Sequence, residues 1–322
     1  MRLRAICLVY CLRCLPKNFN DRQPLLEEIR AEFSLVFFCS VRKMKFKEYR
    51  IPLPLTLDEY RRGQQWTENE LLKETFQTCS TLILLDEQIT DEQHAKIIWE
   101  KLPFSYKSHL APSTSITHKK YRIQNSKSKL FDFFLLNTKA DFILDEFSFN
   151  NWPYTLTILE NVEYSLRIFI QSFYVNNHLT MFNRAEHCQF YFPWNNDDER
   201  KSFNQYEIIN IAERFDEKKD YRIDEDPTRN FSRKKPHLLP LQLNSKWYEN
   251  WPSHQPSMCV YKLIELILFN EKSLLTKATN KLLCSSILKT QKMIYHRFHQ
   301  KMLTNIDQWI ENENNDLFTH QR

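Results

Sequence analysis

Two lysines lie among apolar residues in segments whose alternating side chains predict β-strands. In residues 115–124, Lys119 shares the less polar face with threonine, tyrosine and isoleucine, and in residues 258–269, Lys262 shares its face with valine, isoleucine and leucine. A buried ammonium group is costly unless it is paired or meets an anion. The pattern therefore favours a ligand-binding role for both lysines. The alternative is a different strand register, or stems that run along the sheet so that the charges reach water.

The chain contains a single glycine, Gly63, among 322 residues. Loops that cradle a phosphate need several glycines close together, because only glycine lets the backbone approach the phosphate or take a positive φ at little cost. Nucleotide-binding loops of the Walker, dinucleotide and kinase types are therefore excluded, and so is the nucleophile elbow of hydrolases. No Ser-His-Asp order and no pair of catalytic carboxylates stands out, so we expect no catalytic residues and no enzyme.

Two short motifs have the spacing of metal ligands, but we expect neither to bind a metal. Cys7, Cys11 and Cys14 match the spacing of an iron–sulfur cluster site, yet no glycine-rich cofactor loop follows them. His296 and His299 lie on a predicted helix, where a structural histidine pair is more common than a metal site. The remaining cysteines form no regular disulfide framework, so we expect reduced thiols in a cytoplasmic protein without a cofactor.

Composition and charge narrow the class of protein further. Hydrophobic residues make up 42% of the chain and aromatic residues 14%, enough to bury a large core or to line a large apolar cavity. No apolar run reaches the roughly 18 residues that a membrane-spanning helix needs. Residues 1–43 hold eight basic and four acidic side chains, whereas residues 44–322 hold 37 and 36. The near balance of the second part does not favour binding to nucleic acid.

The first 43 residues differ from the rest in pattern as well as in charge. Their apolar runs are too short to span a membrane, and the cleavage site of a secretory signal peptide is missing. A strand-like pattern begins at Met44. We therefore predict that residues 1–43 are an extension outside the fold and that residues 44–322 form one domain.

Capping signals predict how the chain continues after its first strand. The segments Thr56–Glu59 and Thr67–Glu70 both match the capping box Thr-x-x-Glu. They predict two short helices over residues 57–62 and 68–76. Gly63 is then expected to end the first helix in the left-handed conformation that favours glycine.

The remaining pattern predicts strands first and a long helix last. Residues 153–161 and 164–175 predict a pair of strands joined by a tight connection, and residues 176–205 and 220–257 predict long surface connections. Apolar residues with helical spacing over about 276–311 predict the final helix. We therefore predict an α+β fold in which this helix packs against one face of a mostly antiparallel sheet.

Several short motifs, in a fixed order, make the chain resemble the phosphatidylinositol transfer proteins. The resemblance covers about residues 44–322, and Met44 lies where members of that family begin. The motifs are Lys47-Glu-Tyr-Arg50, Leu57-Asp-Glu-Tyr60 with Gly63-Gln64, Thr117-His-Lys119, Trp152-Pro-Tyr154, Tyr221 with Asp226-Pro227, Met258-Cys-Val-Tyr-Lys262, Phe298-His299 and Asp307-Gln-Trp309.

The resemblance implies a START-like fold, in which a curved sheet and long helices enclose a single phospholipid in a cavity. It implies a monomer that binds phosphatidylinositol or phosphatidylcholine, contacts membrane surfaces transiently as a peripheral protein, and transfers lipid without covalent chemistry. The residues that it assigns by position are Thr117, Lys119, Asn150 and Gln321 to the inositol ring, Gln64, Thr157, Ser172 and Lys262 to the phosphate, Thr155 and Phe298 to the glycerol and acyl region, and Ser232 to phosphorylation.

The chain departs from the family pattern at three places. Asn270 and Glu271 stand where the family has a Trp-Trp pair that enters the bilayer surface, Gln321 replaces a glutamate, and Thr155 replaces a cysteine. These departures keep open a second hypothesis, a lipid-sensing or scaffolding protein that binds phospholipid but exchanges it poorly. A third, a hydrolase or cyclase of the START-like superfamily, has no catalytic pattern in its favour.

Overall fold

The computed structural model describes most of the chain from Met44 to Glu311. The described residues are 44–78, 80–100, 102, 104–107, 109–111, 113–124, 142–161, 166–176, 206–214, 222–229, 232–235, 238, 240–243, 246–252, 254–268 and 274–311. Residues 1–43, the pair Asn270 and Glu271, and Gln321 lie outside them. The expectation that residues 1–43 lie outside the fold therefore stays a prediction.

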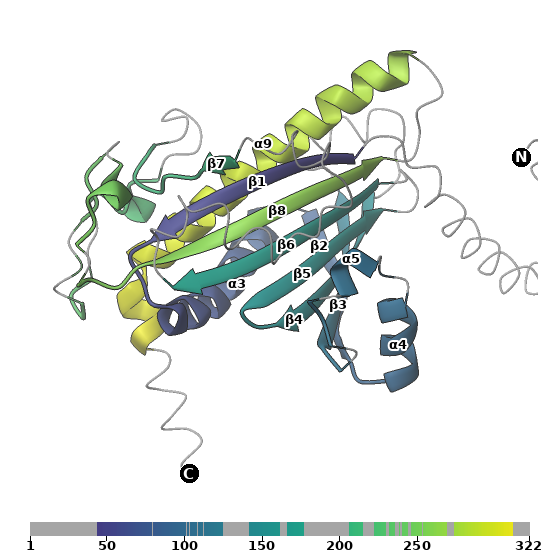
Figure 1. The fold of residues 1–322 in the computed structure, drawn as a ribbon, viewed down its shortest axis with the longest axis horizontal. Coiled ribbons are helices and arrows are strands. Elements are labelled where there is room, and N and C mark those ends of the chain that lie inside the picture. Colours follow the sequence, from purple (N-terminus) through teal and green to yellow (C-terminus); the bar gives the residue numbers. More distant parts are fainter. Residues whose placement is uncertain are drawn as a thin grey trace, which may run out of the picture. The chain divides into compact units, whose positions relative to one another are not determined.

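The described strands form one twisted sheet that is mostly antiparallel (Figure 1). The pairs from β2 through β6 to β8 are antiparallel, and β7 pairs in parallel with β1 at one edge. The strand order is β2 (Ser80–Ile89), β3 (Ser115–Gln124), β4 (Phe142–Asn151), β5 (Tyr154–Asn161), β6 (Leu166–Asn176), β8 (Met258–Leu268), β1 (Met44–Leu53) and β7 (Tyr206–Ile208). The predicted strands and the α+β class are confirmed.

Two long helices cover one face of this sheet, which we call the helix-covered face (Figure 1). They are α3 (Leu57–Thr78) and α9 (Leu274–Thr304), and residues 306–311 continue as helix after a turn at Asn305. The Tyr49 hydroxyl of β1 donates to the Leu288 carbonyl of α9 at 2.9 Å. The long final helix is thus confirmed, and no helix of the described residues is both long and apolar enough to cross a bilayer.

Shorter helices lie elsewhere around the sheet. On the opposite face, α5 (Phe104–Lys107) stacks the Tyr106 ring on the Phe169 ring of β6, with centroids 4.8 Å apart. The remaining helices are α4 (Glu92–Glu100), which contacts β2, and the 3-10 turns η3 (Ile223–Glu225) and η4 (Trp247–Glu249). The region 220–257 was predicted to be a surface connection, but it contributes buried residues such as Trp247 and Tyr248.

The prediction of two short helices after β1 is wrong, because α3 runs without a break through Gly63 and Thr67. The capping box at its start is confirmed, since Thr56 and Glu59 exchange backbone-to-side-chain hydrogen bonds of 2.9 and 3.2 Å. Thr67 caps no helix. Its hydroxyl instead donates to the Gly63 carbonyl one turn earlier, at 2.7 Å.

Gly63 has no positive φ, so the turn predicted there is also wrong. A Cβ atom at this position would lie 2.9 Å from Met302 Cγ and 3.3 Å from Trp309 Cε2. Both of these side chains are buried and belong to the C-terminal helical region. The glycine is therefore required by the close approach of α3 to that region, and backbone conformation does not require it.

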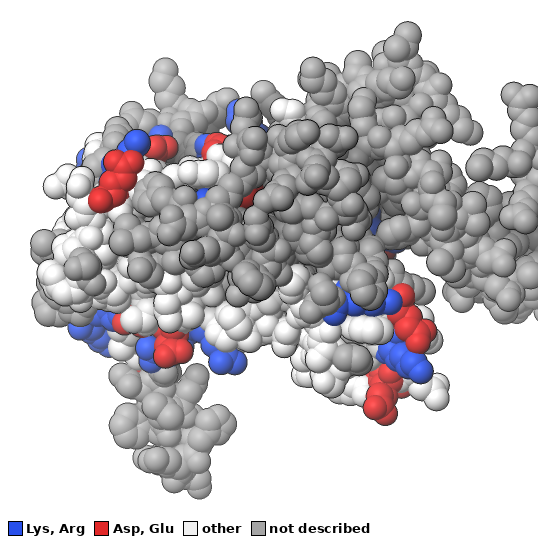
Figure 2. Space-filling model, viewed as in Figure 1, with Lys and Arg blue, Asp and Glu red and all other residues white. Residues whose placement is uncertain are grey.

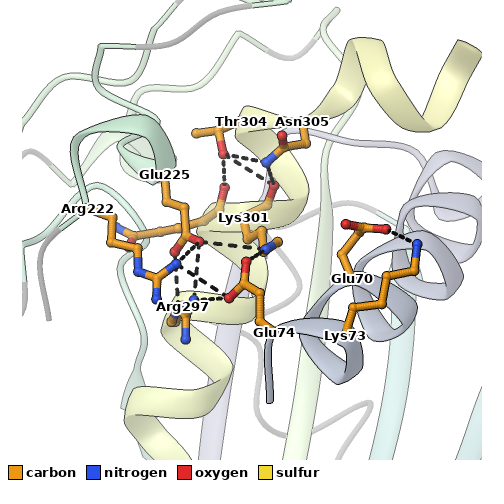
Figure 3. Close-up of polar contacts among 10 residues, drawn as sticks. Glu70, Lys73, Glu74, Arg222, Glu225, Arg297, Lys301, Thr304 and Asn305 are labelled. Carbon is orange, nitrogen blue, oxygen red and sulfur yellow. Dashed lines mark hydrogen bonds and ion pairs between the residues drawn. The ribbon is translucent and has the colours of Figure 1, made fainter. Parts of the chain in front are cut away.

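A cluster of charged side chains also joins α3 to α9 (Figure 3). Glu74 of α3 bonds Lys301 and Arg297 of α9, and Glu225 of η3 accepts from Arg297 Nε at 3.1 Å, with Arg222 beside both carboxylates. Partial burial acts to raise the pKa of Glu74, but the hydrogen bonds from Lys301 and Arg297 hold it below its usual value. We call these five residues the Glu74 cluster.

The opposite face of the sheet buries an acidic side chain, Glu265 of β8. It is 7% exposed and accepts a hydrogen bond from the Tyr106 hydroxyl of α5. Burial raises the pKa of Glu265 to about 7. The carboxyl therefore takes up a proton on folding at mildly acidic pH.

Replacing Gly63 by alanine is expected to destabilise the fold. Alanine is worth about 1 kcal/mol more than glycine inside a helix, but the new methyl group overlaps buried side chains, which costs about 1–3 kcal/mol. We expect a net loss of about 1 kcal/mol in the free energy of unfolding, measured by urea denaturation. Gln65→Ala on the same helix is the control, because this exposed position has room. A Gly63→Ala protein more stable than wild type would contradict the packing argument.

Glu265 gives stability a defined pH dependence. An ordinary glutamate has a pKa of about 4.3, so between about pH 4.5 and 7 the folded protein binds more protons than the unfolded chain, and stability falls as pH rises. The neutral Glu265→Gln variant lacks this loss and should gain about 3 kcal/mol relative to wild type between pH 4.5 and 8. Urea midpoints across this range check it, with exposed Glu92→Gln as control. A stability difference between wild type and Glu265→Gln that does not vary with pH would show that folding leaves the pKa of Glu265 unchanged.

Candidate functional site

The sheet register brings most of the predicted lipid-contacting residues onto the helix-covered face. Residues paired across neighbouring strands point to the same side of a sheet. One row contains Asn150, Thr155, Ser172 and Lys262, running from β4 to β8. The next two rows contain Thr117 with Ser148 and Thr157, and Lys119 with Asp86 and Glu146.

Lys262 lies on β8 near the middle of this face, next to β6 and facing α9. Its ammonium Nζ donates to Ser172 Oγ at 2.8 Å. The same atom lies 5.7 Å from the ring centroid of Tyr174 and 5.3 Å from that of Tyr295. Among the described residues no carboxylate forms an ion pair with Lys262. The strand assignment that placed Lys262 on one face with aliphatic residues is confirmed, and a contact with an anion stays a prediction.

Aromatic and histidine side chains surround Lys262 on the helix side. The Tyr60 hydroxyl of α3 bonds His299 Nε2 of α9 at 3.3 Å, and His299 Nδ1 bonds the Tyr295 carbonyl. Burial, together with the nearby charge of Lys262, lowers the pKa of His299 to about 3. His299 is therefore neutral at physiological pH, and both of its ring nitrogens have protein partners. The positive charge that acts on His299 in this part of the structure is that of Lys262.

Lys119 has a different environment, at the row nearest to β2. Its Nζ lies 3.7 Å from Asp86 Oδ2, and Glu146 is its partner in the register with β4. Burial raises the pKa of Glu146, while the charge of Lys119 and hydrogen bonds from Ser148 and Tyr121 act in the opposite direction. Lys119 thus has carboxylates beside it already. The geometry therefore favours balance of the Lys119 charge by these carboxylates, and it does not favour the expectation that this charge requires an anion from a ligand.

A chain of hydrogen bonds continues from Glu146 along the helix-covered face. Tyr121 and Ser148 each donate to the Glu146 carboxylate at 3.2 Å, and Ser148 Oγ lies 3.3 Å from Thr157 Oγ1. This row presents donors and acceptors side by side. Such a set can bind the hydroxyl groups of a sugar or polyol.

The other assigned residues lie at several places. Gln64 is on α3 and donates to Glu68 at 2.8 Å; the charge of Glu68 acts on Tyr121 and Glu146, so this part of α3 lies near that row. Phe298 is half-buried on α9, with its ring centroid 5.1 Å from that of His299. Asn150 is exposed. Gln321 cannot be placed, because it lies outside the described residues.

Ser232 is part of a packed turn, apart from these rows. It is 5% exposed, and its hydroxyl donates to Asp307, which also accepts from the backbone N–H of Arg233 at 2.9 Å and of Lys234 at 3.1 Å. Partial burial acts to raise the pKa of Asp307, but these hydrogen bonds hold it below its usual value. A phosphate on Ser232 would meet this carboxylate. The assignment of Ser232 to phosphorylation stays a prediction.

The basic residues after Ser232 are largely engaged within the protein. Lys234 pairs with Glu311 at 3.0 Å, and Lys235 pairs with Glu59 of α3. On the face shown in Figure 2, the Lys and Arg side chains of the described residues likewise lie next to Asp and Glu side chains. Neither observation favours a concentrated basic surface there.

Sequence reasoning missed several residues of this face. Glu146 and Ser148 lie on β4, where alternating side chains could have shown that they share one face. Tyr121 shares the strand face of Lys119, but its hydroxyl was given no role. Tyr295 fits the apolar spacing from which the last helix was predicted. Its hydroxyl gives no signal in a pattern that separates apolar from polar residues only.

Comparisons with known proteins agree with this arrangement. Residues 44–319 match the family of the phosphatidylinositol transfer proteins. Phosphatidylinositol transfer protein 4 of Dictyostelium discoideum is 26% identical over 270 residues, which covers 83% of this chain and 70% of the relative. The human phosphatidylinositol transfer protein beta isoform is 28% identical over 270 residues, 82% of this chain and 86% of the relative. The chain therefore belongs to the phosphatidylinositol transfer protein family, a family of lipid transfer proteins that are not enzymes.

Proposed function

We propose that this protein binds one phospholipid between the sheet and its long helices and transfers it between membranes. The observation that carries the proposal is Lys262. Its ammonium group lies on the helix-covered face beside Ser172 and has no carboxylate partner among the described residues. A lipid phosphate supplies the negative charge that offsets the cost of desolvating this cation. Family membership supports the same class of ligand.

The environments of Lys262 and Lys119 favour different parts of the lipid as their ligands. Lys262 and Ser172, with Gln64 and Thr157, would contact the phosphate that all phospholipids share. The row of Lys119, with Glu146 and its donors, would contact the hydroxyl groups of an inositol head group, together with Thr117 and Asn150. Phosphatidylinositol uses both sets of contacts. Phosphatidylcholine, whose head group lacks hydroxyls, uses the first set alone.

A second candidate function is lipid sensing with slow exchange. The ion pairs of Lys234 and Lys235 favour it, because they reduce the charge available for contact with anionic membranes. A vesicle-to-vesicle transfer assay separates the two functions. A carrier moves labelled lipid between vesicles at a rate that rises with protein concentration, whereas a sensor binds lipid and leaves this rate unchanged.

The full chain purified from cells is expected to contain phospholipid in a ratio near one to one. Native mass spectrometry and phosphorus analysis after solvent extraction measure this ratio. Lys262→Met keeps the aliphatic stem but removes the charge, so it should bind phospholipid roughly 10-fold or more weakly. Lys246→Met is the control, since Lys246 is exposed and its ion pair within the described part of the chain is with Glu249, at 3.0 Å. Folded wild-type protein that contains no phospholipid would overturn the proposed function.

Lys119→Ala is expected to reduce binding of phosphatidylinositol and to spare phosphatidylcholine. A lost charge-assisted hydrogen bond corresponds to a decrease of about 10- to 150-fold. Competition between the two lipids for the purified protein measures the change. Lys120→Ala provides a matched control, because the adjacent lysine points to the other face and pairs with Asp145 at 3.2 Å. Equal loss of both lipids in Lys119→Ala would assign Lys119 to the phosphate or to the fold.

A further inference from the structure

Tyr295 of α9 has a buried hydroxyl group without a hydrogen-bond partner among the described residues. The residue is 8% exposed, and the centroid of its ring lies 5.3 Å from Lys262 Nζ. Its ring also lies edge-on to the ring of Tyr49 of β1, with centroids 6.1 Å apart. The Tyr295 side chain therefore lies between α9 and the sheet, next to Lys262 of β8.

The neighbouring tyrosines differ from Tyr295 in having protein partners. The Tyr49 hydroxyl donates to the Leu288 carbonyl, and the Tyr60 hydroxyl bonds His299. A buried polar group that lacks a partner destabilises a protein, and phenylalanine would fill the same space without that cost. The hydroxyl of Tyr295 is thus explained best by a partner that is not part of the protein.

The groups around Tyr295 identify the chemistry of that partner. Lys262 Nζ donates to Ser172 Oγ, which leaves the Ser172 proton free to be donated further. Burial is the main cause that raises the pKa of Tyr295, so its hydroxyl keeps its proton. The ammonium, the serine and the tyrosine together are donors carrying a positive charge. Such a set fits an anion with several acceptor oxygens.

We propose that the Tyr295 hydroxyl donates a hydrogen bond to the phosphodiester of the bound phospholipid, beside Lys262 and Ser172. The inference rests on the proposed function and adds a contact from the helix to the contacts from β6 and β8. Because the phosphate is common to all glycerophospholipids, the contact raises affinity for any head group. A neutral diacylglycerol, which lacks the phosphate, gains nothing from it.

The test compares the full-length Tyr295→Phe protein with wild type in equilibrium binding of three fluorescent lipids with identical acyl chains. The lipids are phosphatidylcholine, phosphatidylinositol and diacylglycerol. We expect Tyr295→Phe to bind both phospholipids about 10-fold more weakly and diacylglycerol equally well. We also expect the lipid-free variant to be at least as heat-stable as lipid-free wild type, because an unpartnered buried hydroxyl has been removed. Tyr49→Phe is the matched control. It removes a hydroxyl that already bonds the Leu288 carbonyl of α9, so it should lower stability without changing the preference for phospholipid over diacylglycerol.

Every other result would reject either the phosphate contact or the proposed function. Unchanged phospholipid binding by Tyr295→Phe, or equal loss of all three lipids, would assign the hydroxyl to the fold and reject the phosphate contact while the proposed function stands. Wild-type protein that binds neither phospholipid would reject the proposed function, and this inference with it. Weaker binding of phosphatidylinositol alone would assign Tyr295 to the head group and also reject the phosphate contact.

Discussion

The close packing of α3 against the C-terminal helical region is the constraint on which the helix-covered face depends. At Gly63 the two elements approach so closely that a methyl group would touch Met302 and Trp309. Near the other end of α3, the Glu74 cluster joins the same helices through charges (Figure 3). Between these contacts the helices cover the sheet, and the side chains beneath lose water. Tyr60 and His299 illustrate the consequence, since both are fully buried and bonded to each other across the helices.

The two lysines of this face differ in the charges that lie beside them. Lys119 lies near β2, beside Asp86 and opposite Glu146, so its charge is balanced within the protein. Lys262 lies under α9, where its neighbours are a serine hydroxyl and aromatic rings. A serine hydroxyl and aromatic rings carry no net negative charge, so these neighbours do not neutralise the ammonium group as a carboxylate would. An anionic group that enters this region therefore gains more from Lys262 than from Lys119.

The sequence predicted the strands well because alternation with a period of two is a local signal. Lys119 and Lys262 were placed on the correct faces by counting residues alone. Gly63 was misassigned for a physical reason: a glycine after a capping box has the local features of a helix end, while its actual requirement comes from Trp309, far away in the chain. Local rules do not contain that contact. The same holds for Thr67, whose capping signal is overridden because the helix continues and its hydroxyl bonds back to Gly63.

The candidate site was predicted in part, for a related reason. Pairing between strands places residues that are distant in the sequence side by side, as it does for Thr155 and Ser172. The contribution of a helix to a site is harder to foresee, because helical periodicity shows which face is buried but not which atom of a buried side chain lacks a partner. Tyr295 has apolar spacing and a polar end. Its role follows from three-dimensional packing, which places the ring of a helix residue over a strand lysine.

Selectivity and affinity can therefore vary separately in this fold. Donors and acceptors suited to a head group lie on β3 and β4, whereas Lys262, which forms no ion pair among the described residues, lies on β8 next to β6. Under the proposed function, a change near Glu146 would alter the contacts to head-group hydroxyls without moving Lys262. A change in α9 alters the surroundings of Lys262 and leaves the Glu146 row in place. The same helix bears Tyr295 near the cation and Lys301 in the Glu74 cluster. Displacing α9 would thus disturb the contacts at Lys262 and the packing against α3 together, so under the proposed function a phosphate held at Lys262 would lose its surroundings when α9 moves away from α3.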